Sequence, residues 1–138
     1  PYLMGERSPI NDTNARGTFI GMTMDTTRSD LVQAVLEGVA FAIRDSFEVA
    51  RSLGLDIPSS KLCGGGSRSP LWRTIFANVL GIPLELPKTE QGPGYGGAML
   101  AMVGCGLFES VQAAADALVE VASVVEPDLE LTARYEAR

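Results

Sequence analysis

Residues 61–81, KLCGGGSRSPLWRTIFANVLG, hold the pattern that decides the fold. Their composition predicts a short buried strand over residues 61–63, a glycine turn over 64–67 and a helix over 69–80. Pro70 suits the first helical position, where its missing N–H has no partner to lose. A strand that passes through a tight turn into a helix is the unit from which layered α/β domains are built.

The same alternation continues on both sides of this stretch. The residues before it predict a strand rich in β-branched and aromatic side chains, and then a long amphipathic helix that opens with a capping box. The expected elements are a strand over residues 17–23, a helix from Thr27 to about Leu53, a strand over 83–87, and helices over 93–105 and 110–122. Strands that alternate with helices predict an α/β fold. Three strands are few for a complete sheet, so the other strands are expected upstream of this chain.

The bulk composition is typical of one globular domain or one lobe of a larger protein. Of the 138 residues, 46% are hydrophobic and 20% are charged, which allows a real core. The net charge of -6 argues against nucleic acid or an anionic membrane as a partner. A nucleotide site is still allowed, because local backbone N–H groups rather than the net charge decide it.

Histidine and cysteine usage restricts the chemistry further. The absence of histidine excludes a Ser-His-Asp or Cys-His centre and any histidine-ligated metal within these residues. Cys63 and Cys105 have apolar, glycine-flanked neighbours and are expected to be buried free thiols of a cytoplasmic protein. No apolar run is long enough to span a membrane, and no secretory signal opens the chain. Because the chain lacks an initiator Met, we expect it to be a fragment.

The glycine turn could hold a ligand. Glycine accepts a positive φ and has no Cβ, so a ligand can approach the backbone, and free N–H groups at a helix start favour anionic atoms. A tight turn without a ligand is the competing interpretation, and no Walker A motif is present. The residues Gly64-x-Gly66-x-x-Ser69 approximate a dinucleotide-binding fingerprint, with serine in place of its third glycine. Glu85 follows at the spacing of that motif's ribose-binding acid, so a dinucleotide site is a further alternative.

Several ordered motifs resemble one known family. Residues 17–37 read GTFIGM, seven further residues, and then DLVQAVLE. This stretch is similar to the carboxy-terminal signature of the FGGY carbohydrate kinases. The motifs GERSP at 5–9, EGVAF at 37–41, GGGSRS at 64–69 and LWR at 71–73 are similar to the xylulose kinases of that family. The resemblance runs along nearly the whole chain.

The resemblance implies an actin-like, ribonuclease-H-like fold of two α/β lobes around a cleft. Residues 1–138 would form the carboxy-terminal, nucleotide-binding domain, while the sugar and the catalytic aspartate would belong mainly to the amino-terminal lobe. The reaction would be transfer of the γ-phosphoryl group of ATP to a sugar hydroxyl, with Mg²⁺. The favoured acceptor is D-xylulose, giving D-xylulose 5-phosphate. Ribulose, gluconate and glycerol are the alternative acceptors.

Carried onto this sequence, the resemblance places an adenosine loop at the glycine turn. Gly65 and Gly66 would lie closest to the ribose and the α-phosphate, and the two residues that follow would line the adenine side. Pro70 departs from the pattern, because some relatives have near this position an asparagine that can contact adenine. The candidate nucleotide-binding residues are Gly64, Gly65, Gly66, Ser67 and Arg68.

No catalytic residue can be assigned within the chain, and the Mg²⁺ ligands are expected mainly outside it. The expected partners are ATP, a small sugar and the protein's own amino-terminal lobe, and a homodimer is left open. For Glu6, Arg7 and Arg16, a salt bridge on the surface or between the lobes is favoured over phosphate contact. Trp72 is expected in the core rather than stacked on the base.

Two other functional classes stand beside the sugar-kinase lobe. One is a binding module of the same fold without catalysis, and the other is the dinucleotide-binding half of an oxidoreductase. An upstream lobe with a catalytic aspartate would separate the first two classes, and the family signature argues against the third. The isolated 138 residues are expected not to phosphorylate a sugar. Gly66→Val in the complete protein is expected to raise the KM for ATP by filling space that the nucleotide uses.

Overall fold

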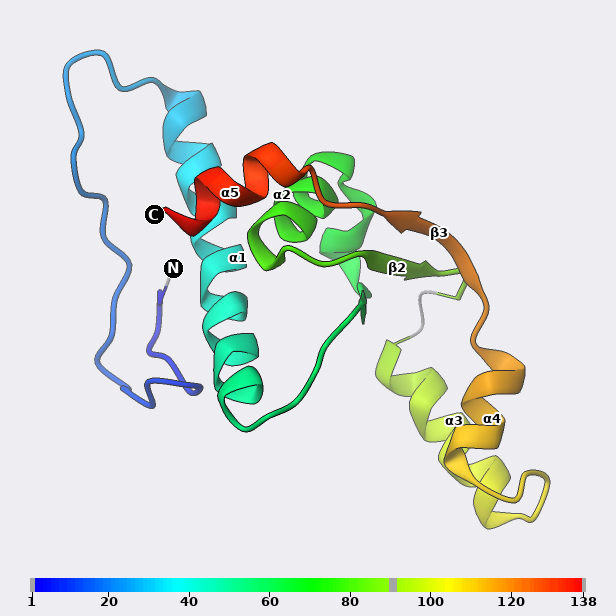
Figure 1. Ribbon diagram of the computed structural model, residues 1–138. Coiled ribbons are helices and arrows are strands. Elements are labelled where there is room, and N and C mark those ends of the chain that lie inside the picture. The colour runs from blue at the N-terminus through cyan, green and yellow to red at the C-terminus, as the bar shows by residue number, and fades with distance from the viewer. Residues whose placement is uncertain (1, 90–91, 138) are drawn as a thin grey trace.

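The computed structural model describes residues 2–89 and 92–137 and shows helices arranged around a small sheet (Figure 1). The elements are α1 (Arg28–Ser52), β1 (Ser60–Lys61), the 3₁₀ helix η1 (Gly65–Arg68), α2 (Pro70–Leu80), β2 (Leu84–Pro87), α3 (Gly92–Gly104), α4 (Val111–Leu118), β3 (Val121–Val125) and α5 (Leu129–Glu136). The sheet has the order β1-β2-β3, with β1 parallel to β2 and β2 antiparallel to β3. This architecture agrees with the α/β class expected from the sequence.

Helix α2 lies at the centre of the main body because its apolar residues meet several neighbours at once. Ile75 and Val79 pack with Ala40 of α1 in one buried cluster. Ala77 and Leu84 belong to a second cluster, which joins α2 to β2. The turn that follows β1 therefore leads directly into the helix with the most buried residues in the described part of the chain.

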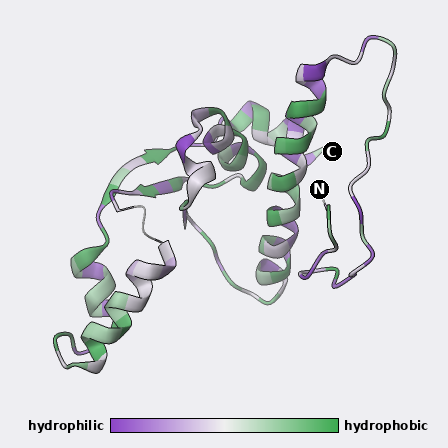
Figure 2. Ribbon diagram, turned by 180° about the vertical axis from the view of Figure 1, so that it is seen from behind, coloured by the Kyte–Doolittle hydropathy of each residue, from purple (hydrophilic) through white to green (hydrophobic). Residues whose placement is uncertain are grey.

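Helices α3 and α4 form a hairpin that extends from the end of the sheet away from α1 (Figure 1). Figure 2 colours most of this hairpin as neutral or hydrophobic. No described residue of α3 is buried, and Leu100 is 59% exposed. The apolar surface of the hairpin is therefore not covered by the described part of this chain.

The two main helices begin where the sequence predicts. The Thr27 hydroxyl accepts a hydrogen bond from the N–H of Asp30, and the Asp30 carboxylate accepts one from the N–H of Thr27. These hydrogen bonds with Thr27 lower the pKa of the Asp30 carboxyl. Ser69 caps α2, which ends at Leu80 as expected. Three other predicted elements, residues 61–63, 83–87 and 93–105, overlap with β1, β2 and α3.

The strand expected over residues 17–23 is not formed among the described residues. This segment is extended and exposed, with Ile20 at 93% exposure and Phe19 at 52%. A strand requires a neighbouring backbone with which to form a ladder, and none of the described strands lies against this segment. The prediction was wrong because strand composition alone does not supply that neighbour.

The helix expected over residues 110–122 is also shorter than predicted. Helix α4 ends at Leu118, and Val121 to Val125 form β3 against β2. The β-branched valines fit a pleated ladder better than a helix, and pairing with β2 overrides the local pattern. The prediction also missed α5, which begins after its N-cap residue Asp128.

The two cysteines are exposed rather than buried. Cys63 follows β1 at the sheet edge, and Cys105 follows α3 on the extended hairpin. The apolar, glycine-rich sequence around each thiol predicted burial, but glycines leave little side-chain surface to cover a neighbour. Neither thiol belongs to a disulfide.

An ion pair that should respond to acid joins α1 to α5. Arg44 donates to Glu136 at 2.6 Å and to the carbonyl of Val79 at 3.1 Å. The hydrogen bond from Arg44 lowers the pKa of the Glu136 carboxyl. A carboxyl with a lowered folded-state pKa adds stability above its unfolded pKa and loses that contribution as the pH falls through its folded pKa.

Glu136→Gln is therefore expected to reduce the free energy of unfolding slightly at neutral pH, because the exposed pair is partly screened by solvent. The difference from the native protein should shrink as the pH falls below the ordinary range of a glutamate carboxyl. Urea unfolding at neutral and at acidic pH measures both differences. A gap of the same size at both pH values would contradict the assignment.

Candidate functional site

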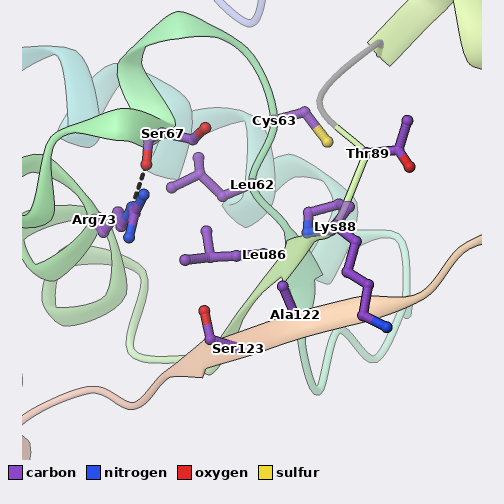
Figure 3. Close-up of a pocket in the computed structure, with 10 residues that line it drawn as sticks. Leu62, Cys63, Ser67, Arg73, Leu86, Lys88, Thr89, Ala122 and Ser123 are labelled. Atoms are coloured by element: carbon purple, nitrogen blue, oxygen red, sulfur yellow. Dashed lines mark hydrogen bonds between the residues drawn. The ribbon is translucent and has the colours of Figure 1, made fainter.

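The glycine turn lies at the carboxyl ends of the two parallel strands. β1 leads through Leu62 into residues 64–67, and β2 leads into Lys88 and Thr89. The N–H of Leu62 donates to the carbonyl of Glu85 at 2.9 Å, so the pairing continues to the edge of the turn. Ligands of open α/β sheets bind outside the carboxyl ends of the strands. This edge is therefore the candidate functional site (Figure 3).

The three positions of the turn carry glycine for different structural reasons. Gly64 enters the turn with a φ of 89°, which favours glycine. A Cβ on Gly66 would lie 2.6 Å from Cζ3 of Trp72, so the indole ring leaves no room for a side chain there. A Cβ on Gly65 would have no heavy atom within 4 Å. The backbone is thus open to a ligand at Gly65, and valine at Gly66 would displace Trp72 rather than a nucleotide.

The carbonyl oxygens of the turn are held from within the protein. The Gly64 carbonyl accepts from the N–H of Ser67 at 3.1 Å and from its hydroxyl at 2.7 Å. The Gly66 carbonyl accepts from the N–H of Ser69 at 3.1 Å, and the Ser67 carbonyl accepts from Nε of Arg73. In a planar trans peptide the N–H points opposite to the carbonyl. The N–H of Gly65, which shares its peptide with the Gly64 carbonyl, therefore faces away from these contacts, as in an anion-binding turn.

A cavity of about 250 Å³ lies between the turn and the ends of β2 and β3. Ser67 and Arg73 line one side, and Lys88 and Thr89 line the other (Figure 3). Lys88 forms an ion pair with Glu120, and its hydrogen bond lowers the pKa of the Glu120 carboxyl. The Lys88 ammonium is therefore occupied by Glu120, and the cavity wall also includes the apolar side chains of Leu62 and Leu86.

The structure brings the five predicted binding residues together in one turn, but they are not equally accessible. Ser67 is 5% exposed, and its hydroxyl is used inside the turn. This side chain stabilises the loop and is not offered to an adenine ring. Arg68 is exposed at the end of η1, and Pro70 is exposed at the first position of α2. The accessible part of the site is therefore the backbone of Gly64 and Gly65 together with Arg68.

The acidic residue that a dinucleotide site would need is already bound within the protein. Glu85 accepts hydrogen bonds from Lys61 at 2.8 Å and from Ser59 at 3.1 Å. The bond from Lys61 and then the bond from Ser59 lower the pKa of the Glu85 carboxyl. A ribose-binding acid has to accept from sugar hydroxyls instead. In addition, Gly65 and Gly66 lie within the 3₁₀ helix η1 that precedes α2, whereas the fingerprint opens directly into an α-helix.

Glu6 and Arg16 bind the backbone of their own segment. The Glu6 carboxylate accepts from the backbone N–H groups of Ser8, Ile10 and Asn11 at 2.5 to 3.1 Å. Arg16 donates to the carbonyls of Thr13 and Ala15 at 3.0 and 2.7 Å. Within residues 2–89 and 92–137, neither takes part in a salt bridge, and a bridge to the other lobe stays a prediction. They stabilise the turns of the first segment.

Sequence reasoning placed Trp72 correctly but did not single out Arg73. Trp72 packs near Phe76, with ring centroids 5.6 Å apart, against the buried α1–α2 cluster. Arg73 lies one helical turn after Ser69, and helical side chains point back toward the N-terminus. That spacing was the available signal that Arg73 reaches the glycine turn. Lys88 was missed although it directly follows a strand whose carboxyl end meets the turn.

The described residues bring together no metal centre. Within residues 2–89 and 92–137, no group of three or more His, Cys, Asp or Glu residues is placed to hold a metal ion. The turn offers N–H donors, whereas Mg²⁺ takes oxygen ligands, so the turn alone does not fit that ion. In the same part of the chain, no helix has the length and apolarity needed to cross a membrane.

Comparison with known proteins finds relatives along the whole chain. Residues 1–105 match a family described as "FGGY family of carbohydrate kinases, C-terminal domain". A xylulose kinase from Staphylococcus epidermidis is 36% identical over 136 residues, which are 99% of this chain and 27% of that protein. The chain therefore spans about a quarter of the length of this curated relative.

Two solved structures extend the comparison to the fold. A "xyloylose kinase" from Brucella ovis matches with a TM-score of 0.87 and 39% identity, over 99% of this chain and 28% of that one. A gluconate kinase from Lactobacillus acidophilus matches with a TM-score of 0.89 and 28% identity, over 99% and 28% of the two chains. The actin-like fold class expected from the sequence is confirmed by these neighbours.

Proposed function

Because the chain belongs to the FGGY family of carbohydrate kinases, we propose that residues 1–138 form the nucleotide-binding half of an enzyme that transfers the γ-phosphoryl group of ATP to a sugar hydroxyl. The matching family description is that of a carboxy-terminal domain, which supports the presence of a separate amino-terminal lobe. In phosphoryl transfer the protein mainly positions the reactants and stabilises charge. Holding the nucleotide is therefore a substantial share of the catalytic task.

One observation carries the assignment of the nucleotide to the glycine turn: the backbone is open at Gly65, where an added Cβ would meet nothing within 4 Å. The Gly64 carbonyl is already bound inside the turn, which leaves the N–H of Gly65, on the opposite side of the same peptide, to face a ligand. ATP supplies the phosphoryl group. The backbone N–H groups would donate to its ribose or phosphate oxygens, and the exposed Arg68 would border the bound nucleotide.

D-Xylulose is the favoured acceptor, with D-xylulose 5-phosphate as the product. The support is the similarity to proteins named xylulose kinase in Staphylococcus epidermidis and Brucella ovis. A protein of similar fold is named as a gluconate kinase, so similarity in this part of the chain is compatible with more than one sugar acceptor. Ribulose, gluconate and glycerol are therefore the acceptors against which xylulose has to be compared. The residues that choose among them belong to the amino-terminal lobe in this proposal.

An exposed apolar face of this chain supports the proposal that another part of the same protein packs against it. A groove of about 310 Å³ lies between α1 and residues 17–20. Among its lining residues, Phe19, Ile20 and Val35 are 52%, 93% and 49% exposed. Contiguous apolar surface of this kind marks a packing interface. The amino-terminal part of the full-length protein would cover it and give residues 17–23 the strand neighbour that the described chain lacks.

The catalytic aspartate and the Mg²⁺ ligands are assigned to that amino-terminal part as well. The described residues bring together no acidic cluster that could hold the ion, so the proposal derives no catalytic step from this chain. Its residues bind the nucleotide and orient it toward the cleft. A binding module of the same fold without catalysis is the competing function, and turnover distinguishes the two.

The full-length protein is expected to release ADP when supplied with ATP, Mg²⁺ and D-xylulose, and to do so faster than with ribulose, gluconate or glycerol. The isolated 138-residue chain is expected to give no sugar-dependent release, because the acceptor site is missing. A coupled ADP-release assay with each acceptor measures both results.

Assays without sugar provide the control for ATP hydrolysis. Turnover by the isolated chain would contradict the division of labour between the lobes. ADP binding by the full-length protein without turnover on any acceptor would favour the binding module.

A further inference from the structure

The 3₁₀ helix η1 is too short to be stable by itself. A helical turn of four residues gains few hydrogen bonds for the dihedral angles it fixes. Its first two residues are Gly65 and Gly66, which lose more backbone freedom on ordering than any other residue type. The turn must therefore be held by groups outside its own backbone.

Two side chains hold this turn at its two ends. The Ser67 hydroxyl donates to the Gly64 carbonyl at 2.7 Å, and Nε of Arg73 donates to the Ser67 carbonyl (Figure 3). Ser67 is buried, and the hydrogen bond from Arg73 is partly buried beside the cavity. Arg73 belongs to α2, and two other residues of that helix, Ile75 and Val79, are buried in the core. The contact therefore ties a weak turn to a rigid helix.

We propose that Arg73 is a positioning residue for the nucleotide, and this inference rests on the proposed function of the turn. Arg73 fixes Ser67, and Ser67 binds the Gly64 carbonyl through both its N–H and its hydroxyl. Because the peptide between Gly64 and Gly65 is planar, a fixed carbonyl also fixes the direction of the Gly65 N–H. Arg73 thus orients a ligand-facing N–H without contacting the ligand.

Loss of this contact should weaken nucleotide binding, because a smaller fraction of the molecules would hold the turn in the conformation that binds. The apparent dissociation constant rises in inverse proportion to the fraction of molecules that are competent to bind. A hydrogen bond from a charged donor to a buried carbonyl is strong enough for its loss to weaken binding about tenfold.

Substitutions at position 73 distinguish the role of the hydrogen-bond donor from that of the positive charge, because glutamine keeps a donor and methionine keeps neither. The amide nitrogen of glutamine stands at the same number of bonds from Cα as Nε of arginine, and it carries hydrogens but no charge. Methionine has a similar length and no donor. In the full-length protein, Arg73→Gln is expected to change the Kd for ADP less than about twofold, and Arg73→Met is expected to raise it about tenfold.

Arg51 of α1, which contacts the other end of α2, provides a matched control. It donates to the carbonyl of Leu80 at 3.4 Å, which is the same kind of contact away from the turn. Arg51→Met is expected to leave the Kd for ADP unchanged. Isothermal titration calorimetry with ADP gives Kd, and steady-state kinetics should show that Arg73→Met raises the KM for ATP while the KM for the sugar stays the same.

Each outcome decides the proposal. Equal losses in Arg73→Gln and Arg73→Met would overturn it in favour of direct charge contact with a phosphate. If Arg73→Met does not fold, Arg73→Gln is compared with Arg73→Lys, which keeps the charge but moves the donor by one bond. Positioning predicts tighter ADP binding by the glutamine variant, and the opposite order would overturn it.

The test also separates this inference from the proposed function. If Arg73→Met binds ADP normally while Gly65→Val does not, the positioning role fails and the nucleotide site stands. If both variants bind ADP normally, the turn is not the nucleotide site and both proposals fail.

Discussion

Gly65→Val is expected to abolish measurable ADP binding in the full-length protein while the fold is retained. An added Cβ at this position meets no protein atom within 4 Å, so the valine side chain starts in the space assigned to the ligand. Steric exclusion from a backbone-lined site should raise the Kd for ADP by about hundredfold or more, which corresponds to about 2.7 kcal/mol. Calorimetric titration with ADP measures the loss, and thermal unfolding tests whether the fold is retained.

Gly104→Val is the matched control for this prediction. Gly104 ends α3, and a Cβ there would also meet no atom within 4 Å. The control should bind ADP like the native protein because it lies outside the turn. Normal ADP binding by Gly65→Val, with its melting temperature unchanged, would exclude the turn as the nucleotide site.

Gly66→Val is expected to act on stability instead of directly on the nucleotide. Its Cβ would lie 2.6 Å and 2.8 Å from two carbon atoms of the Trp72 indole, and the ring would have to move within the α1–α2 cluster. Overpacking of this kind costs about 1 to 3 kcal/mol in the free energy of unfolding. Urea unfolding of the native and variant proteins measures the difference.

A second substitution tests the cause of that loss. Trp72→Leu leaves room beside position 66, so Gly66→Val should be less destabilising in the Trp72→Leu background than in the native one. A double-mutant cycle gives the coupling between the two positions. Additive effects would show that the indole ring is not what excludes a side chain at Gly66.

The helices around the site were predictable because their signals are local. Thr27 and Asp30 form a capping box within a single helical turn, and Ser69 with Pro70 marks the start of α2 in the same way. These contacts depend only on neighbours a few residues apart. The position of the glycine turn was predictable for the same reason, because it joins a strand pattern directly to a helix pattern.

The strands were less predictable because their partners are distant in the sequence. Val121 to Val125 become β3 only because β2 lies beside them, and residues 17–23 form no strand because no described strand lies beside them. Local composition gave the wrong result in both segments, because it does not report which backbone lies alongside. The exposure of Cys63 and Cys105 was missed for a related reason, since burial depends on which elements pack nearby.

The amino-acid sequence by itself determined the alternation of strands and helices, the place of the glycine turn and the family to which the chain belongs, because these depend on the order and spacing of residues. Only the tertiary structure decided what each residue of the turn does. Gly66 accommodates Trp72, Gly65 is open to a ligand, and Arg73 reaches Ser67. The physical reason is that steric exclusion and hydrogen bonding act between atoms that the fold brings together.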